Sequence, residues 1–124
     1  NPPYFIDALK CPDEQRCTAR HAGNLNYDLL FHRSASLLEE QGVVSIIIPA
    51  EAEKTVVDTA WNHKLFPLHR VQVFTKPGKP CRRVLLNFGF EAKECREEKL
   101  CIEVNHNEFT PEYVALTKDF YLKM

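Results

Sequence analysis

The run Val43–Ile48 is the feature that most constrains the fold of this chain. It reads Val-Val-Ser-Ile-Ile-Ile, so apolar β-branched side chains would lie on both faces of a strand. Strands of this kind are typical of parallel sheets that are covered on both faces. A helical pattern stands directly before this run and another follows it. We therefore predict an α/β fold in which helices pack on a sheet.

The flanking segments predict three helices. Asn26 is a suitable N-cap for a first helix that Gly42 would stop, and a second helix is expected from about Ala52 to Lys64. Thr110-Pro111 opens a last helix, because threonine caps well and proline suits the first helical position. The apolar residues expected to face the core are Tyr27, Leu30, Phe31, Leu37, Leu38, Val56, Val57, Ala60, Trp61, Tyr113, Leu116 and Phe120.

Three further strands are expected between the second and the last helix. Residues 70–74 and 82–90 form apolar runs on either side of a turn-rich connector at 76–80. Alternating apolar residues at 100–104 indicate a half-exposed edge strand. No apolar run is long enough to span a membrane, and the first residues lack the pattern of a signal peptide.

The cysteines argue against a metal site. They stand at positions 11, 17, 81, 95 and 101 and form no Cys-x-x-Cys pair, whereas zinc ligands usually lie two to four residues apart. We expect reduced thiols and no metal. The alternative is a small secreted binding protein stabilised by disulfides.

Charge is unevenly distributed, although the net charge is only −1. Residues 62–83 contain six lysine or arginine residues and no acidic residue, and residues 91–108 contain six glutamates against three basic residues. Solvated faces of a folded domain would explain both stretches. A surface that meets phosphates would also explain the basic one.

The first four residues, Asn1-Pro2-Pro3-Tyr4, carry a chemical motif. They match the pattern Asn/Asp/Ser-Pro-Pro-aromatic of methyltransferases that modify exocyclic amino groups. The side-chain oxygen of Asn1 and the carbonyl of Pro2 can accept the two N–H groups of such an amine, held in place by the stiff Pro2-Pro3 segment. This geometry aims the nitrogen lone pair at a methyl donor. Tyr4 offers a face on which a flipped base can stack.

The rest of the chain resembles the C-terminal half of bacterial tRNA adenine-N6-methyltransferases of the type that modifies the adenine 3′ of the anticodon in a valine tRNA. Besides the motif, the landmarks are Arg20-His21, residues 38–42, Pro49-Ala50-Glu51, residues 83–86, Tyr113, residues 115–117 and residues 120–122. The resemblance covers nearly the whole chain. It implies a class I methyltransferase fold, a seven-stranded, mostly parallel sheet that binds S-adenosylmethionine mainly through its N-terminal half.

This chain lacks the glycine-rich loop and the acidic residue of that N-terminal half. The chain also starts with Asn1, and its one methionine is Met124. We therefore expect residues 1–124 to be the C-terminal half of a methyltransferase domain, with a catalytic and substrate loop at 1–25 and an α/β body at 26–124. Only Asn1 would reach the edge of the cofactor site, and the chain alone would be inactive. By resemblance, residues 70–74 and 82–90 form the closing antiparallel strand pair of the sheet, with Val43–Ile48 beside them.

The resemblance implies methyl transfer from S-adenosylmethionine to the N6 amine of an adenine in tRNA, in the cytoplasm. A protein glutamine, a DNA adenine or a small molecule is the alternative substrate within the same family. The expected RNA contacts are Arg16, Arg20, His21, Lys76, Lys79, Arg82 and Arg83. The strand Val43–Ile48 would expose one unpaired edge, so we also expect the chain to self-associate there.

Overall fold

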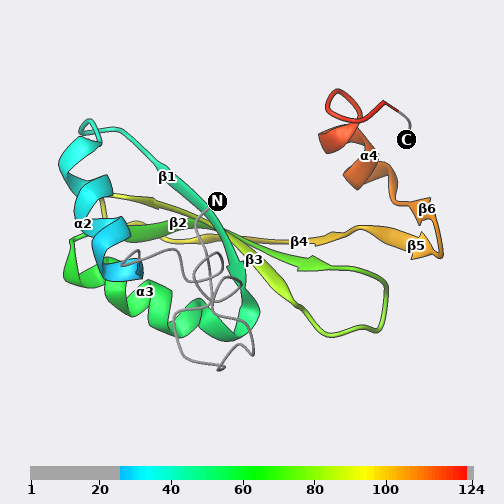
Figure 1. Cartoon of the computed structure of the whole chain (residues 1–124), viewed down its shortest axis with the longest axis horizontal. Helices are drawn as coiled ribbons and strands as arrows, with labels where there is room; N and C mark the ends of the chain where they lie inside the picture. Colours follow the sequence, from blue (N-terminus) through cyan, green and yellow to red (C-terminus); the bar gives the residue numbers. More distant parts are fainter. Residues whose placement is uncertain (1–25, 123–124) are drawn as a thin grey trace, which may run out of the picture.

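The computed structural model describes residues 26–122. Their largest unit is a four-stranded sheet with the strand order β1-β3-β2-β4 (Figure 1). The central strand β3 is antiparallel to both of its neighbours, and β2 and β4 are parallel. The strands are β1 (Val44–Pro49), β2 (Phe66–Phe74), β3 (Arg83–Gly89) and β4 (Arg96–Cys101). The prediction of an α/β fold with a closing antiparallel pair is confirmed by β2 and β3, with β1 beside them.

Helices α2 (Tyr27–Leu37) and α3 (Glu53–Asn62) lie together against the sheet, near the end opposite α4 (Figure 1). A 3₁₀ turn, Ala50–Ala52, joins β1 to α3. Beyond β4 the chain forms a small hairpin of β5 (Glu103–Asn105) and β6 (Glu108–Phe109), followed by α4 (Pro111–Thr117). None of the helices in this described part is long and apolar enough to cross a membrane.

The core lies between the two helices and one face of β1 and β3. On β3, alternate residues Val84, Leu86 and Phe88 are buried, and they stand opposite residues 48, 46 and 44 of β1. The Phe31 ring of α2 packs edge-on against Phe88, with 5.1 Å between the ring centroids. The fully or nearly fully buried apolar residues are Tyr27, Phe31, Ile48, Val56, Ala60, Leu65, Val84, Leu86 and Phe88.

A charged contact fixes α3 to the sheet. Arg70 of β2 donates from Nη2 to Oε1 of Glu53 at 2.8 Å and from Nε to Oε2 of the same carboxylate. The hydrogen bond to Glu53 raises the pKa of Arg70, although burial acts in the opposite direction. Glu97 of β4 lies 3.5 Å from the other guanidinium nitrogen, so the contact spans α3, β2 and β4.

The two predicted helix caps are confirmed, but the bounds of two helices differ from the prediction. Asn26 accepts a hydrogen bond from the Leu29 backbone at 2.8 Å, and Thr110 accepts one from Tyr113 at 3.2 Å. Helix α2 ends at Leu37, not near Gly42, because Leu38 already has an extended backbone. Helix α3 begins at Glu53 and ends at Asn62, slightly inside the expected range.

Several residues expected in the core are exposed. Trp61 is 57% exposed and contacts Phe66 at the surface, with the ring centroids 4.8 Å apart. Helix α4 buries none of its residues, and Phe120, which is 85% exposed, follows its end at Thr117. Trp61 lies within α3, but only one narrow stripe of that helix reaches a neighbour, whereas Phe120 lies beyond the last residue of α4.

The prediction that residues 43–48 form a strand buried on both faces is also wrong within the sheet that residues 26–122 form. β1 occupies the edge of the sheet, and Ser45 and Ile47 face outward from the helix side. Its partner is the antiparallel β3. The expected edge strand at 100–104 divides between β4, which ends at Cys101, and the separate β5–β6 hairpin. Strand β2 begins at Phe66, four residues earlier than expected.

The contact between α2 and β3 yields a stability prediction. Phe31→Ala should lower the free energy of unfolding by about 3–5 kcal/mol, because it removes a fully buried ring and leaves a cavity against Phe88. Leu37→Ala is the control on the same helix, since Leu37 is 83% exposed, and it should change stability by less than about 0.5 kcal/mol. Urea unfolding followed by circular dichroism measures both. Equal effects of the two substitutions would contradict the assignment of the core.

Candidate functional site

The directions of the strands bring the ends of several strands to one edge of the sheet. Because β1 and β2 are both antiparallel to β3, and β4 is parallel to β2, the three strands β1, β2 and β4 run in the same direction. Their carboxyl ends at Pro49, Phe74 and Cys101 therefore lie on one side, together with the start of β3 at Arg83. In open α/β sheets, ligands bind outside the carboxyl ends of the strands. This carboxyl edge is the candidate functional site.

Two arginines stand where β1 leaves the sheet. The backbone N–H of Ala50 donates to the carbonyl of Arg82 at 3.0 Å, and Pro49 stands opposite Arg83 in the register. Both arginine side chains are exposed, and Arg83 donates from Nη1 to the Arg82 carbonyl at 3.1 Å. The connection from β1 to α3 thus runs beside a pair of positive charges.

A hydrogen-bonded turn carries two lysines between the end of β2 and the start of β3. Gly78 has a φ of 77°, a left-handed conformation that glycine adopts without strain, and prolines stand at positions 77 and 80. The backbone N–H of Lys79 donates to the carbonyl of Lys76 at 3.2 Å, which closes the turn. Lys76 and Lys79 are therefore held at fixed positions on the backbone.

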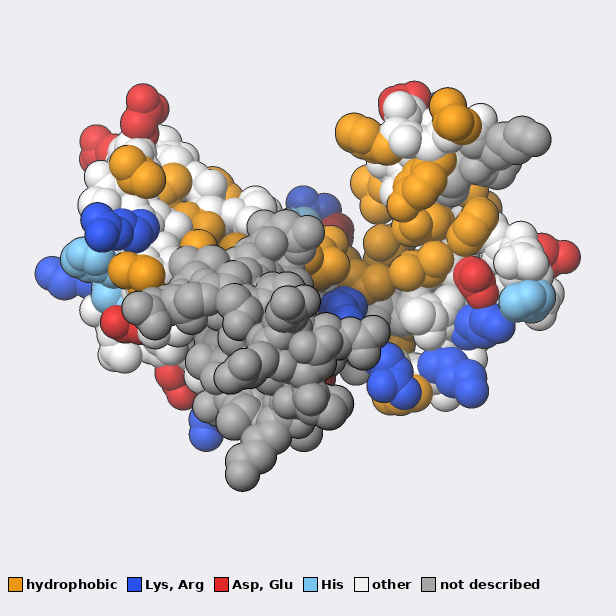
Figure 2. Space-filling model, in the orientation of Figure 1, with side chains coloured by type: hydrophobic (Ala, Val, Ile, Leu, Met, Phe, Trp, Pro, Cys, Tyr) orange, Lys and Arg blue, Asp and Glu red, His pale blue; other side chains and the backbone are white. Residues whose placement is uncertain are grey.

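The turn and β4 enclose an open groove of about 700 Å³, which we call the lysine groove. Its lining consists of Phe74, Lys76, Pro77, Gly78, Lys79, Pro80, Lys99 and Cys101. The parallel register places Cys101 opposite Phe74 and Lys99 opposite Gln72. Figure 2 shows lysine and arginine side chains gathered at this end of the molecule, beside an apolar patch that extends towards α4.

The structure brings together part of the predicted site. Lys76 and Lys79 line the lysine groove, and Arg82 and Arg83 follow at the same edge. Sequence reasoning missed Lys99, because it stands within the acidic stretch 91–108 and reaches the groove only through the pairing of β4 with β2. The remaining predicted site residues lie outside the described residues: Asn1, Pro2, Pro3, Tyr4, Arg16, Arg20 and His21.

The sheet face that points away from α2 and α3 holds a second groove, of about 510 Å³, beneath α4. Of its charged groups, Glu98 is already paired with His69. Glu98 hydrogen-bonds to His69 Nε2 at 2.8 Å and accepts from Arg96 at 2.6 Å. Both hydrogen bonds lower the pKa of Glu98, and the bond to His69 has the larger effect. This carboxyl group is therefore a poor candidate for an acid or a base near neutral pH.

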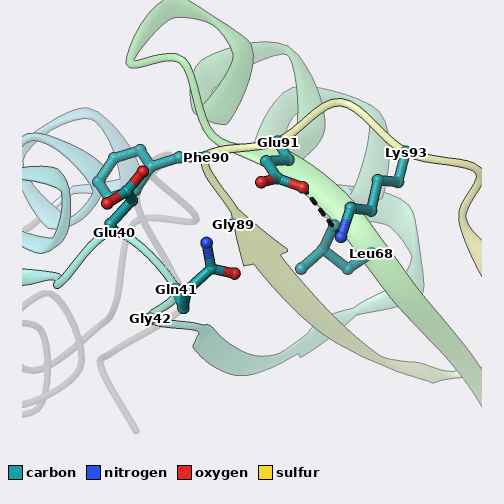
Figure 3. A pocket seen from close by; sticks show the side chains of 8 residues that line it. All are labelled: Glu40, Gln41, Gly42, Leu68, Gly89, Phe90, Glu91 and Lys93. Carbon is teal, nitrogen blue, oxygen red and sulfur yellow. Dashed lines mark ion pairs between the residues drawn. The ribbon is translucent and has the colours of Figure 1, made fainter.

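At the opposite, amino edge of the sheet a small pocket of about 40 Å³ lies between the ends of β1, β2 and β3 (Figure 3). Lys93 pairs with Glu91 at 2.9 Å across its rim, which lowers the pKa of Glu91. A side chain on Gly42 would meet Leu38 Cδ2 at 2.7 Å, and one on Gly89 would meet Leu68 Cδ1 at 2.8 Å. The glycines thus allow close packing, and the space left suits a water molecule rather than a substrate.

The three described cysteines, at positions 81, 95 and 101, are free thiols. Cys81 and Cys101 donate to the backbone carbonyls of Arg83 and Glu103 at 3.2 and 3.3 Å, and burial raises the pKa of Cys95. Residues 26–122 contain no group of three or more side chains that could hold a metal ion.

Comparison with known proteins finds relatives that align with this chain along all or nearly all of its residues. The chain is 46% identical over 124 residues to a protein named tRNA1(Val) (adenine(37)-N6)-methyltransferase from Bacteroides fragilis, and 44% identical to one of the same name from Phocaeicola vulgatus. A third, from Yersinia enterocolitica, is 34% identical over 122 residues. The chain spans 49–53% of the length of these relatives. No protein-family model matches the chain.

A solved structure supports the fold. A predicted O-methyltransferase from Agrobacterium tumefaciens matches 74% of this chain and 45% of its own chain, with a TM-score of 0.64 and 14% identity. At that identity the likeness concerns the fold alone. The whole chain is thus homologous to a segment of the tRNA1(Val) (adenine(37)-N6)-methyltransferases that makes up about half the length of each, and it has a methyltransferase fold.

Proposed function

We propose that the chain is the C-terminal half of an enzyme that transfers a methyl group from S-adenosylmethionine to the N6 amine of an adenine in tRNA. The observation that carries this proposal is the 46% identity along all 124 residues to a relative of that name. The fold supports it, because the strands of the C-terminal half place their carboxyl ends at a single, positively charged edge. Such an enzyme would act in the cytoplasm.

In this proposal Asn1–Tyr4 form the catalytic loop. The amine of adenine is a weak nucleophile because its lone pair is delocalised into the ring. Two fixed acceptors, the side-chain oxygen of Asn1 and the carbonyl of Pro2, favour a nitrogen whose lone pair points at the methyl donor. Tyr4 would stack on the flipped base. Neither a strong base nor a metal ion is needed for this step.

The described residues do not fit S-adenosylmethionine by themselves. The amino-edge pocket, of about 40 Å³, is too small for the cofactor, and the lysine groove would repel the positive sulfonium centre of the cofactor. The sequence contains no glycine-rich dinucleotide fingerprint either. We therefore assign the cofactor site to the half of the relatives that this chain does not span, with Asn1 at its edge. The chain alone should be inactive.

The positive edge favours a nucleic acid over the alternative substrates in the family. A protein glutamine or an uncharged small molecule would gain nothing from the five cationic side chains beside the strand ends. DNA adenine shares the phosphate chemistry of tRNA. The assay below therefore includes DNA as a competing substrate.

We also propose that the chain self-associates through β1. This strand lies at the edge of the sheet, and Ile47, on its outward face, is 37% exposed. An unpaired edge rich in β-branched residues can accept another strand. The predicted partner is a second copy of the chain when the other half of the enzyme is missing.

A chimera tests the enzymatic proposal. In the Bacteroides fragilis relative, the half that matches this chain is replaced by the chain itself. The chimera should transfer labelled methyl groups to unmodified tRNA, and Asn1→Ala should lower kcat about a hundredfold or more, because one of the two acceptors for the amine is lost. The isolated chain should show no transfer.

Lys93→Ala is the control for the chimera, because Lys93 lies at the amino edge beside Glu91 and should leave kcat unchanged. A chimera that methylates DNA but not tRNA would contradict the proposed substrate. Full activity of the Asn1→Ala chimera would contradict the role of the motif.

Light scattering tests the association. The isolated chain should have a mass above that of its 14.4 kDa monomer and the mass should rise with concentration. Ile47→Lys should return it to the monomer, because a charge on an edge strand opposes pairing. Leu37→Lys adds the same charge on the exposed side of α2 and should not. A wild-type chain that stays monomeric at high concentration overturns this proposal.

A further inference from the structure

The lysine groove carries positive charge that the described residues do not neutralise. Lys76 lies 3.6 Å from Glu103, but no carboxylate of residues 26–122 lies within 4.0 Å of Lys79 or Lys99. None of the eight residues that line the groove is acidic. Ammonium groups gathered around one groove repel one another, and an anion bound between them would relieve this repulsion.

The floor of the groove is apolar. Phe74 and Cys101 stand opposite each other on neighbouring strands, and Pro77 and Pro80 continue the apolar surface along the turn. A groove with a cationic rim and an apolar floor that contains an aromatic ring suits a single nucleic-acid strand, whose phosphates meet the lysines while a sugar or base packs on the floor. A free phosphate ion or an acidic peptide would use only the rim.

The groove is built in advance of binding. Its two sides are the closed turn around Gly78 and the end of β4, which is fixed by its ladder with β2. Arg82 and Arg83 extend the positive surface from the turn to the point where β1 leaves the sheet. A strand that follows these charges therefore runs along the carboxyl edge.

We propose that the lysine groove binds the sugar–phosphate backbone of a single-stranded segment of the RNA, with Lys79 and Lys99 each contacting a phosphate. This inference rests on the proposed function, since it takes the RNA to be the tRNA substrate. It assigns a role to Lys99, which the sequence pattern placed on an acidic surface. The groove holds the strand beside the edge where the methylated base would enter.

Binding of a fluorescein-labelled, unmodified tRNA transcript to the full 124-residue chain and to the chimera tests this inference. Lys79→Ala and Lys99→Ala should each raise Kd about three- to tenfold at 0.1 M salt and reduce the slope of log Kd against log salt by about one. Lys99→Arg keeps the charge and should restore binding. Thermal melts by circular dichroism should be alike for all variants, because both lysines are exposed.

Lys93→Ala is the matched control, since it removes the same charge from an exposed lysine at the opposite edge of the sheet (Figure 3). The inference is overturned if Lys93→Ala weakens binding as much as the groove variants do, or if the groove variants bind like the wild type. It is also overturned if neither the unsubstituted chain nor the unsubstituted chimera binds tRNA. Competition by poly-glutamate as strong as that by single-stranded RNA would also overturn it, because a peptide would then fill the groove.

The inference and the proposed function can fail separately. A chimera that methylates tRNA while the groove variants keep their Kd and salt slope refutes the groove alone. Weakened tRNA binding by the groove variants in a chimera that transfers no methyl group refutes the enzymatic proposal and leaves the groove in place.

Discussion

The antiparallel placement of β3 between β1 and β2 determines most of this structure. One face of β3 supplies Val84, Leu86 and Phe88 to the core, so the strand cannot shift by one residue without exposing all three. Because it pairs with both neighbours in the opposite direction, β1 and β2 must run the same way. Burial of three side chains thus fixes the register of β3, and its antiparallel pairing with β1 and β2 gives these two strands, whose ends form part of the candidate site, a common direction.

The same arrangement explains why the two edges of the sheet differ. At the amino edge, Gly42 and Gly89 allow the chain to pack closely, and Glu91 neutralises Lys93. At the carboxyl edge the turn around Gly78 projects beyond the helices, so its lysines have few carboxylates within reach. Close packing with paired charge is expected of a structural edge, and open space with unpaired charge is expected of a binding edge.

Local signals in the sequence were reliable, and long-range ones were not. The caps at Asn26 and Thr110 were predicted because a cap needs only its own first turn, and β2 and β3 were predicted as strands from two apolar runs on either side of a turn. Their antiparallel pairing was expected only from the resemblance to a family. The exposure of Trp61 and Phe120 was missed because helical spacing does not say which stripe meets a neighbour. The order of the strands came from the resemblance to a family rather than from the residues.

Lys99 shows most clearly what the sequence does not contain. Lys99 follows two glutamates in the chain, but it lines the same groove as Lys76 and Lys79, because the parallel pairing of β4 with β2 places it opposite Gln72. The net charge of a sequence segment predicts the charge of a surface only where the residues of that segment all lie on that surface. Successive residues of a strand alternate between its two faces, so Glu98, which bonds to His69, is followed by Lys99, which lines the lysine groove and also borders the groove beneath α4. The positive surface is therefore assembled by the strand register, and the acidic stretch contributes to it through a single alternate residue.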